Sequence, residues 1–390
     1  MRIAFVYDLV YPYSKGGVEK RIWDLAHLLS ARGHEVQVLG THCWDGDADL
    51  EVDGIQYRGV GKPQDIHAKG GRRSVWQAVK FAIAAGRALV GLRLDVVEVQ
   101  GMAPLACLVA LAVCKFKRAT PVVIWYEVWR GYWNAYLGRL GYLGRLIEWL
   151  VAKVAPVNVA VSRSAVSRLA ELGVGQVPLL PIGIDYYGIQ KVPRSRLGPD
   201  VLYVGRLASH KNLGLLIDSL SVLKSGGVEP TVLIVGEGPE REVLGRHAKA
   251  EGLANVRFIG HVETHDGVIS LMKSSRVFAF PSLREGFGLA PLEAGACGVP
   301  VVLATHADNA ATELIDDGVN GIVSSGDSVD YARAIGELLG DQRLRDEMGL
   351  EAKKRAETYD WTRMVELTER IYSDSLTGSR VIQAGPSATR

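Results

Sequence analysis

A chain of 390 residues is longer than one hydrophobic core usually serves, so its length favours two domains over one large domain. Its 45 basic and 43 acidic side chains nearly cancel and 48% of its residues are hydrophobic, which excludes a disordered or collagen-like chain and points to no nucleic-acid partner. The four cysteines, Cys43, Cys107, Cys114 and Cys297, form no C-x2-C pair, so they predict neither a disulfide framework nor a zinc site and fit a reducing compartment.

The amino terminus reads RIAFVYD, which predicts a strand and leaves no room for a secretory signal segment. The longest apolar run, residues 103–114, is shorter than the roughly 20 residues of a membrane-spanning helix, so we expect a buried helix there. Both observations predict a cytoplasmic protein.

Short runs rich in Val and Ile alternate with helical stretches, such as residues 19–31, through the first half of the chain. The predicted strands of this half are residues 3–7, 36–39, 96–99, 122–125 and 158–161. Such alternation predicts a parallel sheet covered on both faces by helices.

The pattern restarts after a linker rich in proline and glycine at residues 178–199. The second series of predicted strands is 201–205, 232–235, 256–259, 277–280 and 300–303. We therefore predict an α/β fold of two Rossmann-like doubly wound parallel-sheet domains that face each other across a cleft. Their predicted bounds are 1–185 and 186–355, followed by a terminal helix at 356–372 that packs back on the first domain and a mobile tail at 373–390.

Two basic residues follow the first strand of the second domain, in VLYVGRLASHKN. Arg206 comes just after the strand, and Lys211 is placed at the start of the next helix. A guanidinium and an ammonium at the carboxyl end of a strand can bind a diphosphate through charge-assisted hydrogen bonds. Two solvated surface charges would explain this segment equally well.

The stretch LREGFGLAPLEAGACGVP contains two glutamates around a glycine-rich turn. Gly286 and Gly288 expose the backbone immediately before a predicted helix, whose first N–H groups can bind an anion. Glu293, placed in the first turn, would repel a phosphate beside it and is expected to accept hydrogen bonds from sugar hydroxyls. Glu285 is expected nearer the other end of the ligand.

These motifs resemble the retaining nucleotide-sugar glycosyltransferases of the GT-B fold, specifically glycosyltransferase family 4. The resemblance rests on GR…HK at residues 205–211 and on E-x7-E with GFG between the two glutamates. Shorter motifs agree in order and spacing: GGVE at 16–19, GEGP at 236–239, FIGHV at 258–262 and DGVNG at 317–321. Together they cover nearly the whole chain.

The resemblance implies a nucleotide-diphosphate sugar as donor, a glycan or lipid-linked acceptor, and no cofactor. Arg206 and Lys211 would bind the diphosphate, Glu293 the ribose, and Glu285 the transferred sugar. The other residues implied at the donor site are Gly16, Gly17, Gly205, Gly236, Gly286, Phe287, Gly288 and Leu289. Gly16 and Gly17 are explained equally well by a tight turn.

One position departs from the family pattern. The family usually has a histidine after a central strand of the first domain, where this chain has Tyr126 in VVIWYEVW. A tyrosine, with a reference pKa near ~10, is a poor base at neutral pH but can donate a hydrogen bond to a sugar. The implied catalytic set is Glu285, Tyr126, Arg206 and Lys211. A weakened, donor-binding relative or partner subunit and a sugar-nucleotide epimerase remain alternatives.

Two further segments bear on metals and membranes. Asp45 and Asp47 have D-x-D spacing but lie far in the sequence from the diphosphate segment, so we expect a solvated turn and no metal site. Residues 69–93 carry six basic and no acidic side chains together with Trp76. They predict either an amphipathic helix against an anionic membrane or a helix packed on the sheet with a solvated basic face.

Overall fold

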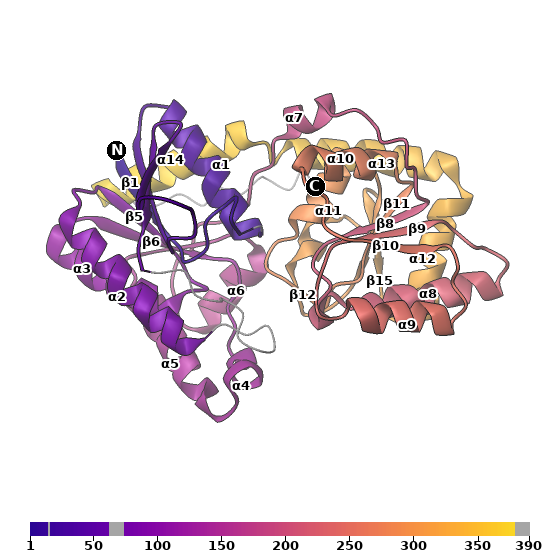
Figure 1. The fold of residues 1–390 in the computed structure, drawn as a ribbon, viewed down its shortest axis with the longest axis horizontal. Helices are drawn as coiled ribbons and strands as arrows, with labels where there is room; N and C mark the ends of the chain where they lie inside the picture. The colour runs from indigo at the N-terminus through magenta and orange to yellow at the C-terminus, as the bar shows by residue number, and fades with distance from the viewer. Residues whose placement is uncertain (15, 62–73, 379–390) are drawn as a thin grey trace. The chain divides into compact units, whose positions relative to one another are not determined.

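The computed structural model describes residues 1–14, 16–61 and 74–378, which divide into two compact units (Figure 1). Unit 1 comprises Met1–Gly183 together with the chain from Thr362 onward, and unit 2 comprises Ile184–Trp361. The sequence analysis placed its domain boundaries after residues 185 and 355.

Unit 1 contains a seven-stranded sheet in the order β3-β4-β2-β1-β5-β6-β7. All neighbouring strands are parallel except β3 and β4, which form an antiparallel hairpin at the edge. The strands are β1 (Arg2–Val6), β2 (Glu35–Gly40), β3 (Asp49–Val52), β4 (Ile55–Gly59), β5 (Val96–Gln100), β6 (Thr120–Trp125) and β7 (Val157–Ala160). The five strands predicted for this half are therefore confirmed, and the hairpin is an addition.

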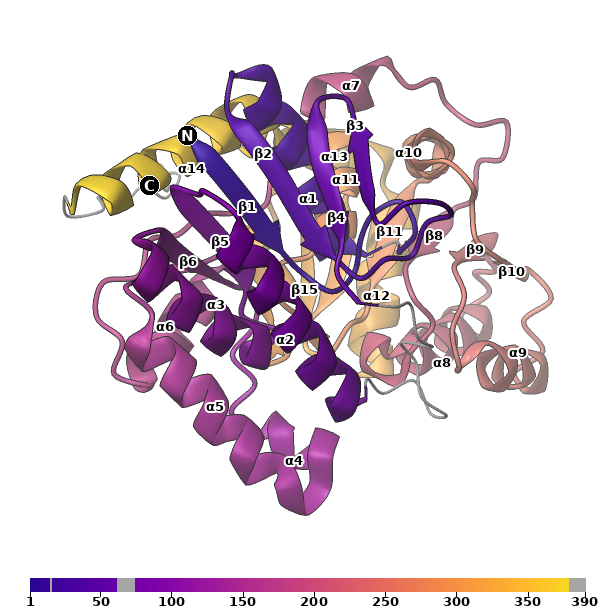
Figure 2. The same ribbon diagram turned by 60° about the vertical axis from the view of Figure 1, so that its left-hand side comes forward.

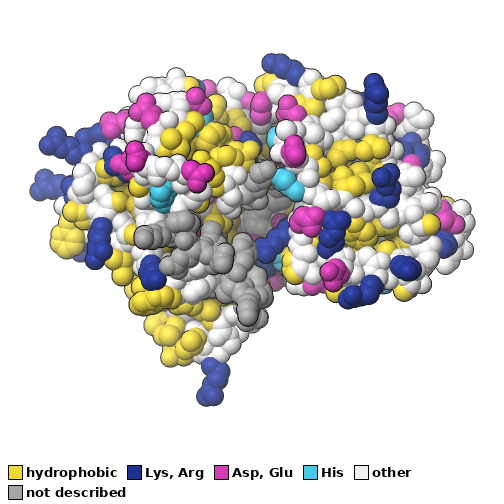
Figure 3. Space-filling view, viewed as in Figure 1, with side chains coloured by type: hydrophobic (Ala, Val, Ile, Leu, Met, Phe, Trp, Pro, Cys, Tyr) yellow, Lys and Arg dark blue, Asp and Glu magenta, His cyan; other side chains and the backbone are white. Residues whose placement is uncertain are grey.

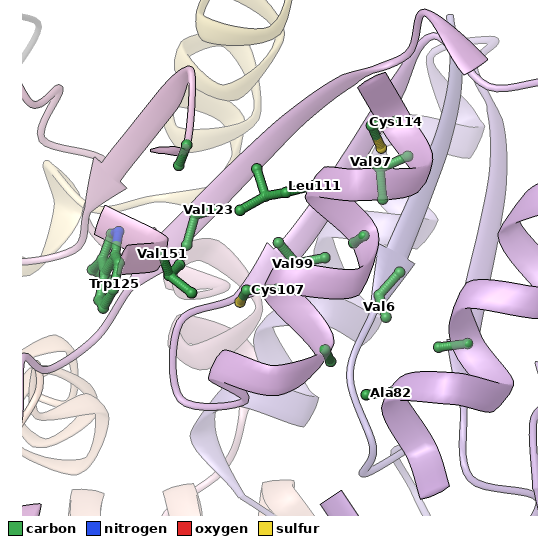
Figure 4. Close-up of a cluster of buried hydrophobic side chains, with 14 of the residues drawn as sticks. Val6, Ala82, Val97, Val99, Cys107, Leu111, Cys114, Val123, Trp125 and Val151 are labelled. Carbon is green, nitrogen blue, oxygen red and sulfur yellow. The ribbon is translucent and has the colours of Figure 1, made fainter. Parts of the chain in front are cut away.

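Helices cover both faces of this sheet, as predicted. They are α1 (Gly17–Ala31), α2 (Val75–Gly91), α3 (Pro104–Lys117), α4 (Tyr132–Leu137), α5 (Gly141–Val154), α6 (Arg163–Glu171) and α14 (Trp361–Thr377). On β5, Val97 and Val99 point into a hydrophobic core with α2, α3, α5 and α6 (Figures 2 and 4). Glu98 lies between them and points to the opposite face, where it contacts α1 and α14, because successive strand residues alternate in direction.

Helix α14 is anchored on unit 1 by polar contacts. Glu369 accepts hydrogen bonds from Arg32 Nε at 3.0 Å and His34 Nε2 at 2.8 Å, and Tyr372 Oη donates to Glu98 at 2.6 Å. The helix continues through residues 373–377, so the predicted start of the tail at residue 373 is wrong. Residues 373–377 are exposed or half-buried, and local hydrogen bonds, such as that from Ser375 Oγ to Tyr372 O at 2.7 Å, run along this end of the helix. The rest of the predicted tail, residues 379–390, lies outside the described residues.

Unit 2 contains a six-stranded parallel sheet in the order β10-β9-β8-β11-β13-β15 and a two-stranded ladder of β12 and β14. The strands are β8 (Val201–Val204), β9 (Val232–Val235), β10 (Val256–Ile259), β11 (Val277–Phe280), β12 (Arg284–Glu285), β13 (Val301–Ala304), β14 (Asp308–Asn309) and β15 (Gly321–Ser324). The chain order reverses between β8 and β11, which is the position where doubly wound sheets bind ligands.

The helices of unit 2 form a layer on each face of its sheet (Figure 1). They are α7 (Tyr186–Lys191), α8 (Leu213–Ser225), α9 (Arg241–Ala250), α10 (His265–Ser274), α11 (Leu289–Ala296), α12 (Ser328–Gly340) and α13 (Gln342–Glu357). Helices α8, α9 and α12 lie on one face, and α10, α11 and α13 on the other. The predicted linker contains α7, which Asp185 caps by accepting a hydrogen bond from the N–H of Gly188.

The apolar run at residues 103–114 lies in α3, where Cys107 and Ala110 are buried, so the prediction of a buried helix is confirmed. Within the described part of the chain, every helix is too short or too polar to cross a bilayer. All four cysteines are free thiols.

Candidate functional site

Three neighbouring strands of unit 2 bring the predicted phosphate-binding segments to one edge of the sheet. Strand β8 pairs with β9 on one side and with β11 on the other, in parallel, so the carboxyl ends of all three lie together. The loops that follow are hydrogen-bonded to each other. The N–H of Leu207 donates to Glu237 O at 2.9 Å, and the N–H of Leu283 donates to His210 O at 2.9 Å.

The close approach of two of these loops requires glycine at Gly236. Its φ is +136°, and a Cβ built there would lie 2.0 Å from the carbonyl oxygen of Gly205. The two predicted glycines after β8 and β9 therefore contact each other directly. Their contact brings the GR and GEGP motifs together at this edge.

Lys211 and Glu285 form an ion pair at the same edge. Lys211 Nζ lies 2.5 Å from Glu285 Oε1, and the two side chains are only 16% and 13% exposed. The ammonium also lies 5.3 Å from the centre of the Phe280 ring, a favourable cation–π distance. Lys211 ends a short 3-10 helix and α8 begins two residues later, so the predicted start of the amphipathic helix at Lys211 is two residues too early. The left-handed conformation of Asn212, with φ of +52°, separates the two helices.

The position of Glu285 is fixed by its backbone. Glu285 belongs to β12, which pairs in parallel with Asp308 and Asn309 of β14. The buried side chain of Asn309 donates to Ser282 O at 2.8 Å and to Ala304 O at 3.1 Å. A short strand therefore replaces the expected irregular loop before Gly286, and the ladder holds the Glu285 carboxylate at the edge of the sheet.

Helix α11 begins directly after the glycine-rich turn. Gly288 precedes it with φ of +103°, and a Cβ there would lie 2.6 Å from Ala311 Cβ. Leu289 is the first helical residue, so its N–H belongs to the unpaired group at the helix start. Phe287 is buried with its ring centre 5.9 Å from that of Tyr359, so its side chain belongs to the core and only its backbone is available to a ligand.

Glu293 lies in the second turn of α11, and the prediction that it falls in the first turn is wrong. The helix starts at Leu289, four residues before it. The Glu293 side chain is 16% exposed, and His265 Nε2 lies 3.5 Å from its Oε1. His265 is the first residue of α10, and nothing in the sequence analysis placed it here.

Arg206 and Lys211 both lie close enough to His210 to affect its charge. Arg206 is exposed, and no carboxylate of the described chain lies within ion-pair distance of its guanidinium. His210 lies between Arg206 and Lys211 in the sequence. Although His210 keeps an exposed surface, partial desolvation and the charges of Lys211, Arg284 and Arg206 lower its pKa to about 4, against the opposing effect of Glu285. The imidazole is therefore neutral at physiological pH.

The predicted donor-site glycines of unit 1 begin a helix. Gly16 is the N-cap of α1 and Gly17 its first residue, which replaces the alternative of a tight turn. A Cβ on Gly16 would lie 2.5 Å from Glu19 Oε2, and Glu19 Oε1 accepts a hydrogen bond from Ser14 Oγ at 2.9 Å. A side chain at Gly16 would therefore have to displace the Glu19 carboxylate from its present position.

Tyr126 follows β6 and lies beside a buried ion pair. Arg21 of α1 donates to Glu98 of β5 at 2.6 Å, and both side chains are at most 1% exposed. Tyr372 of α14 donates to the other oxygen of Glu98 at 2.6 Å. The Tyr126 hydroxyl is enclosed and makes no hydrogen bond with any described residue. Burial raises the pKa of Tyr126 above its usual value, against the opposing effect of the Arg21 cation, so the phenol stays neutral.

The other predicted segments are partly described. Residues 69–73 lie outside the described residues, whereas residues 75–91 form α2, in which Trp76 is 65% exposed and Lys80 Nζ lies 5.9 Å from its ring centre. Asp45 and Asp47 lie in a bend where Trp44 Nε1 donates to Asp47 O at 2.8 Å. The described parts of the chain hold no group of three His, Cys, Asp or Glu side chains that could bind a metal ion.

Sequence comparison assigns a family to each half of the chain. Residues 15–186 match the family described as Glycosyltransferase Family 4, and residues 190–355 match Glycosyl transferases group 1. Among similar proteins, a glycogen synthase of Mycobacterium tuberculosis is 27% identical over 97% of this chain and 96% of its own length. A phosphatidyl-myo-inositol mannosyltransferase of Mycobacterium leprae is 27% identical over 96% of this chain and 98% of its own.

Solved structures share the fold. Sucrose-phosphate synthase from Thermosynechococcus elongatus superposes with a TM-score of 0.81 at 18% identity, covering 97% of this chain and 100% of that chain. The Anabaena protein HepE, solved in complex with UDP and glucose, superposes with a TM-score of 0.73 at 19% identity, covering 96% of this chain and 100% of that chain.

Proposed function

Because the chain belongs to glycosyltransferase family 4 and has the GT-B fold of two Rossmann-like units, we propose that it transfers a hexosyl group from a nucleotide-diphosphate sugar with retention of anomeric configuration. The family and fold predicted from the motifs are thus confirmed. The similar proteins are named as synthases and transferases, which favours a transferase over the epimerase and the binding-only relative.

The observation that carries the proposal is the edge of unit 2 where Arg206, Lys211 and the start of α11 lie after adjacent strands. Two cations and a set of unpaired N–H groups suit a diphosphate. Arg206 and Lys211 would hold it, and the Leu289 N–H would add a donor. Glu293, one turn further along the helix, would accept hydrogen bonds from the ribose hydroxyls.

Glu285 would accept hydrogen bonds from hydroxyls of the transferred sugar. In a front-side transfer, the bond from the anomeric carbon to the phosphate oxygen breaks as the bond to the acceptor oxygen forms on the same face. The departing phosphate oxygen takes the acceptor proton, so no side chain has to act as base. Arg206 and Lys211 stabilise the charge that develops on the leaving diphosphate, and we propose that no metal ion or other cofactor is needed.

Because the hydroxyl of Tyr126 is enclosed by protein, it favours a role in which Tyr126 acts on its neighbouring residues. We propose that Tyr126 is a positioning residue that supports the Arg21–Glu98 pair and the end of β6. Gly16 and Gly17 would present the first backbone groups of α1 to the donor.

Free thiols and the exposed face of α2 support a cytoplasmic enzyme with a peripheral membrane contact. Trp76, Lys80 and Arg87 are exposed on α2, and this helix carries no acidic residue. That combination suits an anionic lipid surface. The acceptor would be a glycan or a lipid-linked molecule.

Calorimetry with nucleoside diphosphates, followed by hydrolysis assays on a panel of nucleotide sugars, tests the proposal. Lys211→Ala is expected to weaken diphosphate binding, because it removes one of the two cations. Lys354→Ala is the matched control, since Lys354 is 61% exposed on α13. Equal affinity of the Lys211→Ala variant and the wild type would remove Lys211 from the site, and NMR of the product's anomeric proton decides between retention and inversion.

A further inference from the structure

Unit 1 contains an apolar groove of about 600 Å³ that the donor site does not use. This volume is in the range of ligand sites in proteins. Its walls come from α2, the start of α3, α4 and α5. The side chains that carry the argument are Phe81, Trp129, Trp133, Tyr136, Leu140 and Leu143.

The groove has a polar end and an apolar end. Asp8 and Thr41, which follow β1 and β2, line it together with Met102, which follows β5. Because β2, β1 and β5 are neighbours and parallel, this end opens at the carboxyl edge of the sheet, beside its reversal of strand order. The remainder of the groove is lined by the aromatic and aliphatic side chains of the helices.

A buried carboxylate holds the aromatic wall in place. Glu148 of α5 is 4% exposed, and it accepts hydrogen bonds from the N–H of Trp129 at 2.7 Å and of Arg130 at 2.9 Å. The Trp129 ring lies 4.7 Å from that of Trp133 and 5.1 Å from that of Tyr136, centre to centre. Glu148 therefore holds the backbone from which this group of neighbouring aromatic rings begins.

The outer face of α5 next to the groove is apolar as well. Its exposed residues recur at helical spacing, whereas the buried face holds Val151 and Ala152. The exposed apolar side chains on α5 are Tyr142, Leu143, Leu146, Trp149, Leu150 and Val154. Hydrophobic side chains gather over α4 and α5 at the lower left of Figure 3.

The helices that form this face carry exposed basic side chains and no exposed acidic ones, whereas Glu127, in the loop before α4, accepts a hydrogen bond from Trp129 Nε1 at 3.0 Å. Helices α2 and α4 contain no acidic residue, and the acid of α5, Glu148, is buried. Arg139, Arg145 and Lys153 are exposed beside the apolar stripe. An apolar helix face flanked by basic side chains suits the surface of an anionic bilayer.

We propose that the groove binds the hydrocarbon chain of a lipid-linked acceptor while the outer face of α5 rests on the bilayer that supplies it. This inference rests on the proposed transferase function and specifies its acceptor class. The polar head of the acceptor lies at the carboxyl edge of the sheet by Asp8 and Thr41, and the chain runs along Trp129, Trp133 and Leu143.

The test compares dodecyl phosphate with butyl phosphate, using the fluorescence of the tryptophans as readout. Each methylene that leaves water contributes about 0.8 kcal/mol, so two buried methylenes already give about tenfold tighter binding. We therefore expect dodecyl phosphate to bind at least about tenfold more tightly. Leu143→Asp and Leu140→Asp, which place a charge in the wall, abolish the preference. Leu350→Asp is the control, because Leu350 is 55% exposed on α13 of unit 2.

A bilayer arm separates the groove from the outer face. Leu146→Asp, at a position 54% exposed on α5 and outside the groove, lowers binding to phosphatidylglycerol vesicles and keeps the preference for dodecyl phosphate. Equal affinity for the two alkyl phosphates overturns the inference, as does a preference that survives both groove variants. A loss of preference in Leu350→Asp would show that the effect of an introduced charge is not specific to the groove, and it would overturn the inference as well.

The donor side is measured separately in the same variants. Nucleoside diphosphate affinity reports on unit 2, and circular dichroism with thermal unfolding confirms that unit 1 is folded in each variant. Absence of diphosphate binding and of nucleotide-sugar hydrolysis in the wild type refutes the transferase function. Whether the groove binds a hydrocarbon chain is decided only by the preference for the longer alkyl phosphate.

Discussion

Replacing Glu285 with glutamine is expected to tighten the binding of a nucleoside diphosphate. In the absence of ligand, the Glu285 carboxylate forms an ion pair with the Lys211 ammonium, which we propose as a binding group for the diphosphate. A diphosphate must therefore displace the carboxylate from Lys211. The bound diphosphate is also repelled by the negative charge of Glu285. Glutamine removes both penalties and keeps the size of the side chain.

The magnitude follows from the burial of the pair. Exposed ion pairs contribute about 0 to 1 kcal/mol, whereas hydrogen bonds to charged groups contribute about 1.5 to 3 kcal/mol. The side chains here are 16% and 13% exposed, with 2.5 Å between Nζ and Oε1, which places the pair near the boundary of the two ranges. A penalty of about 1.4 kcal/mol corresponds to about tenfold tighter binding of the diphosphate to the variant.

Calorimetry with a nucleoside diphosphate on the wild type and Glu285→Gln measures this change. Glu347→Gln is the control, because Glu347 is a 63% exposed residue of α13 that pairs with Arg343. The same Glu285→Gln variant should transfer sugar more slowly, since the amide is a weaker acceptor for the sugar hydroxyls. Unchanged or weaker diphosphate binding in Glu285→Gln would refute the competition between Glu285 and the diphosphate for Lys211.

Three further changes test the rest of the argument. Arg21→Met should lower the free energy of unfolding of unit 1 in urea by about 3 to 5 kcal/mol, because Glu98 is left as a buried charge without its cation. In the control Arg32→Met, at a 40% exposed position, the loss should be about 1 kcal/mol or less, and equal unfolding midpoints of the two variants would contradict this. His210, with its pKa lowered to about 4, binds a proton more readily in the unfolded chain, so the stability of the folded protein should fall as the pH drops from about 6.5 to 4. His210→Gln should reduce this dependence of stability on pH, and identical pH profiles of thermal unfolding for the variant and the wild type would rule it out. Tyr126→Phe should lower turnover more than donor affinity, and steady-state kinetics identical to the wild type would show that the hydroxyl has no part in transfer.

Most of the strands could be predicted because their Val and Ile runs are buried. Strand β9, for example, is apolar and buried at every position and is followed by Gly236, so its pattern is unambiguous. The hairpin of β3 and β4 was missed, although Asp53 and Gly54 both adopt positive φ in its two-residue turn. Asp-Gly is a strong signal for such a turn, but the polar residues of β3 at the sheet edge weakened the strand pattern.

Contacts within the site depended on tertiary structure and could not be predicted. Lys211 and Glu285 are 74 residues apart in the sequence, and they meet because β8 pairs with β11. The contact of His265 with Glu293 likewise depends on how α10 packs beside α11. For Tyr126, the sequence predicted its place after a strand, but its charged and polar neighbours Arg21 of α1 and Tyr372 of α14 lie far from it in the chain.

The placement of the two glutamates explains how a site for an anion can contain two acids. A carboxylate in the first turn of α11 would compete with a phosphate for the unpaired N–H groups, and the second-turn position of Glu293 leaves those groups available. Glu285 neutralises Lys211 in the absence of ligand, and a partly buried ammonium without a partner would be costly. If a diphosphate binds Lys211 as we propose, the freed Glu285 carboxylate would need new donors, which the hydroxyls of the attached sugar would provide. The exchange therefore favours a complete nucleotide sugar over free pyrophosphate, since pyrophosphate leaves Glu285 without a partner.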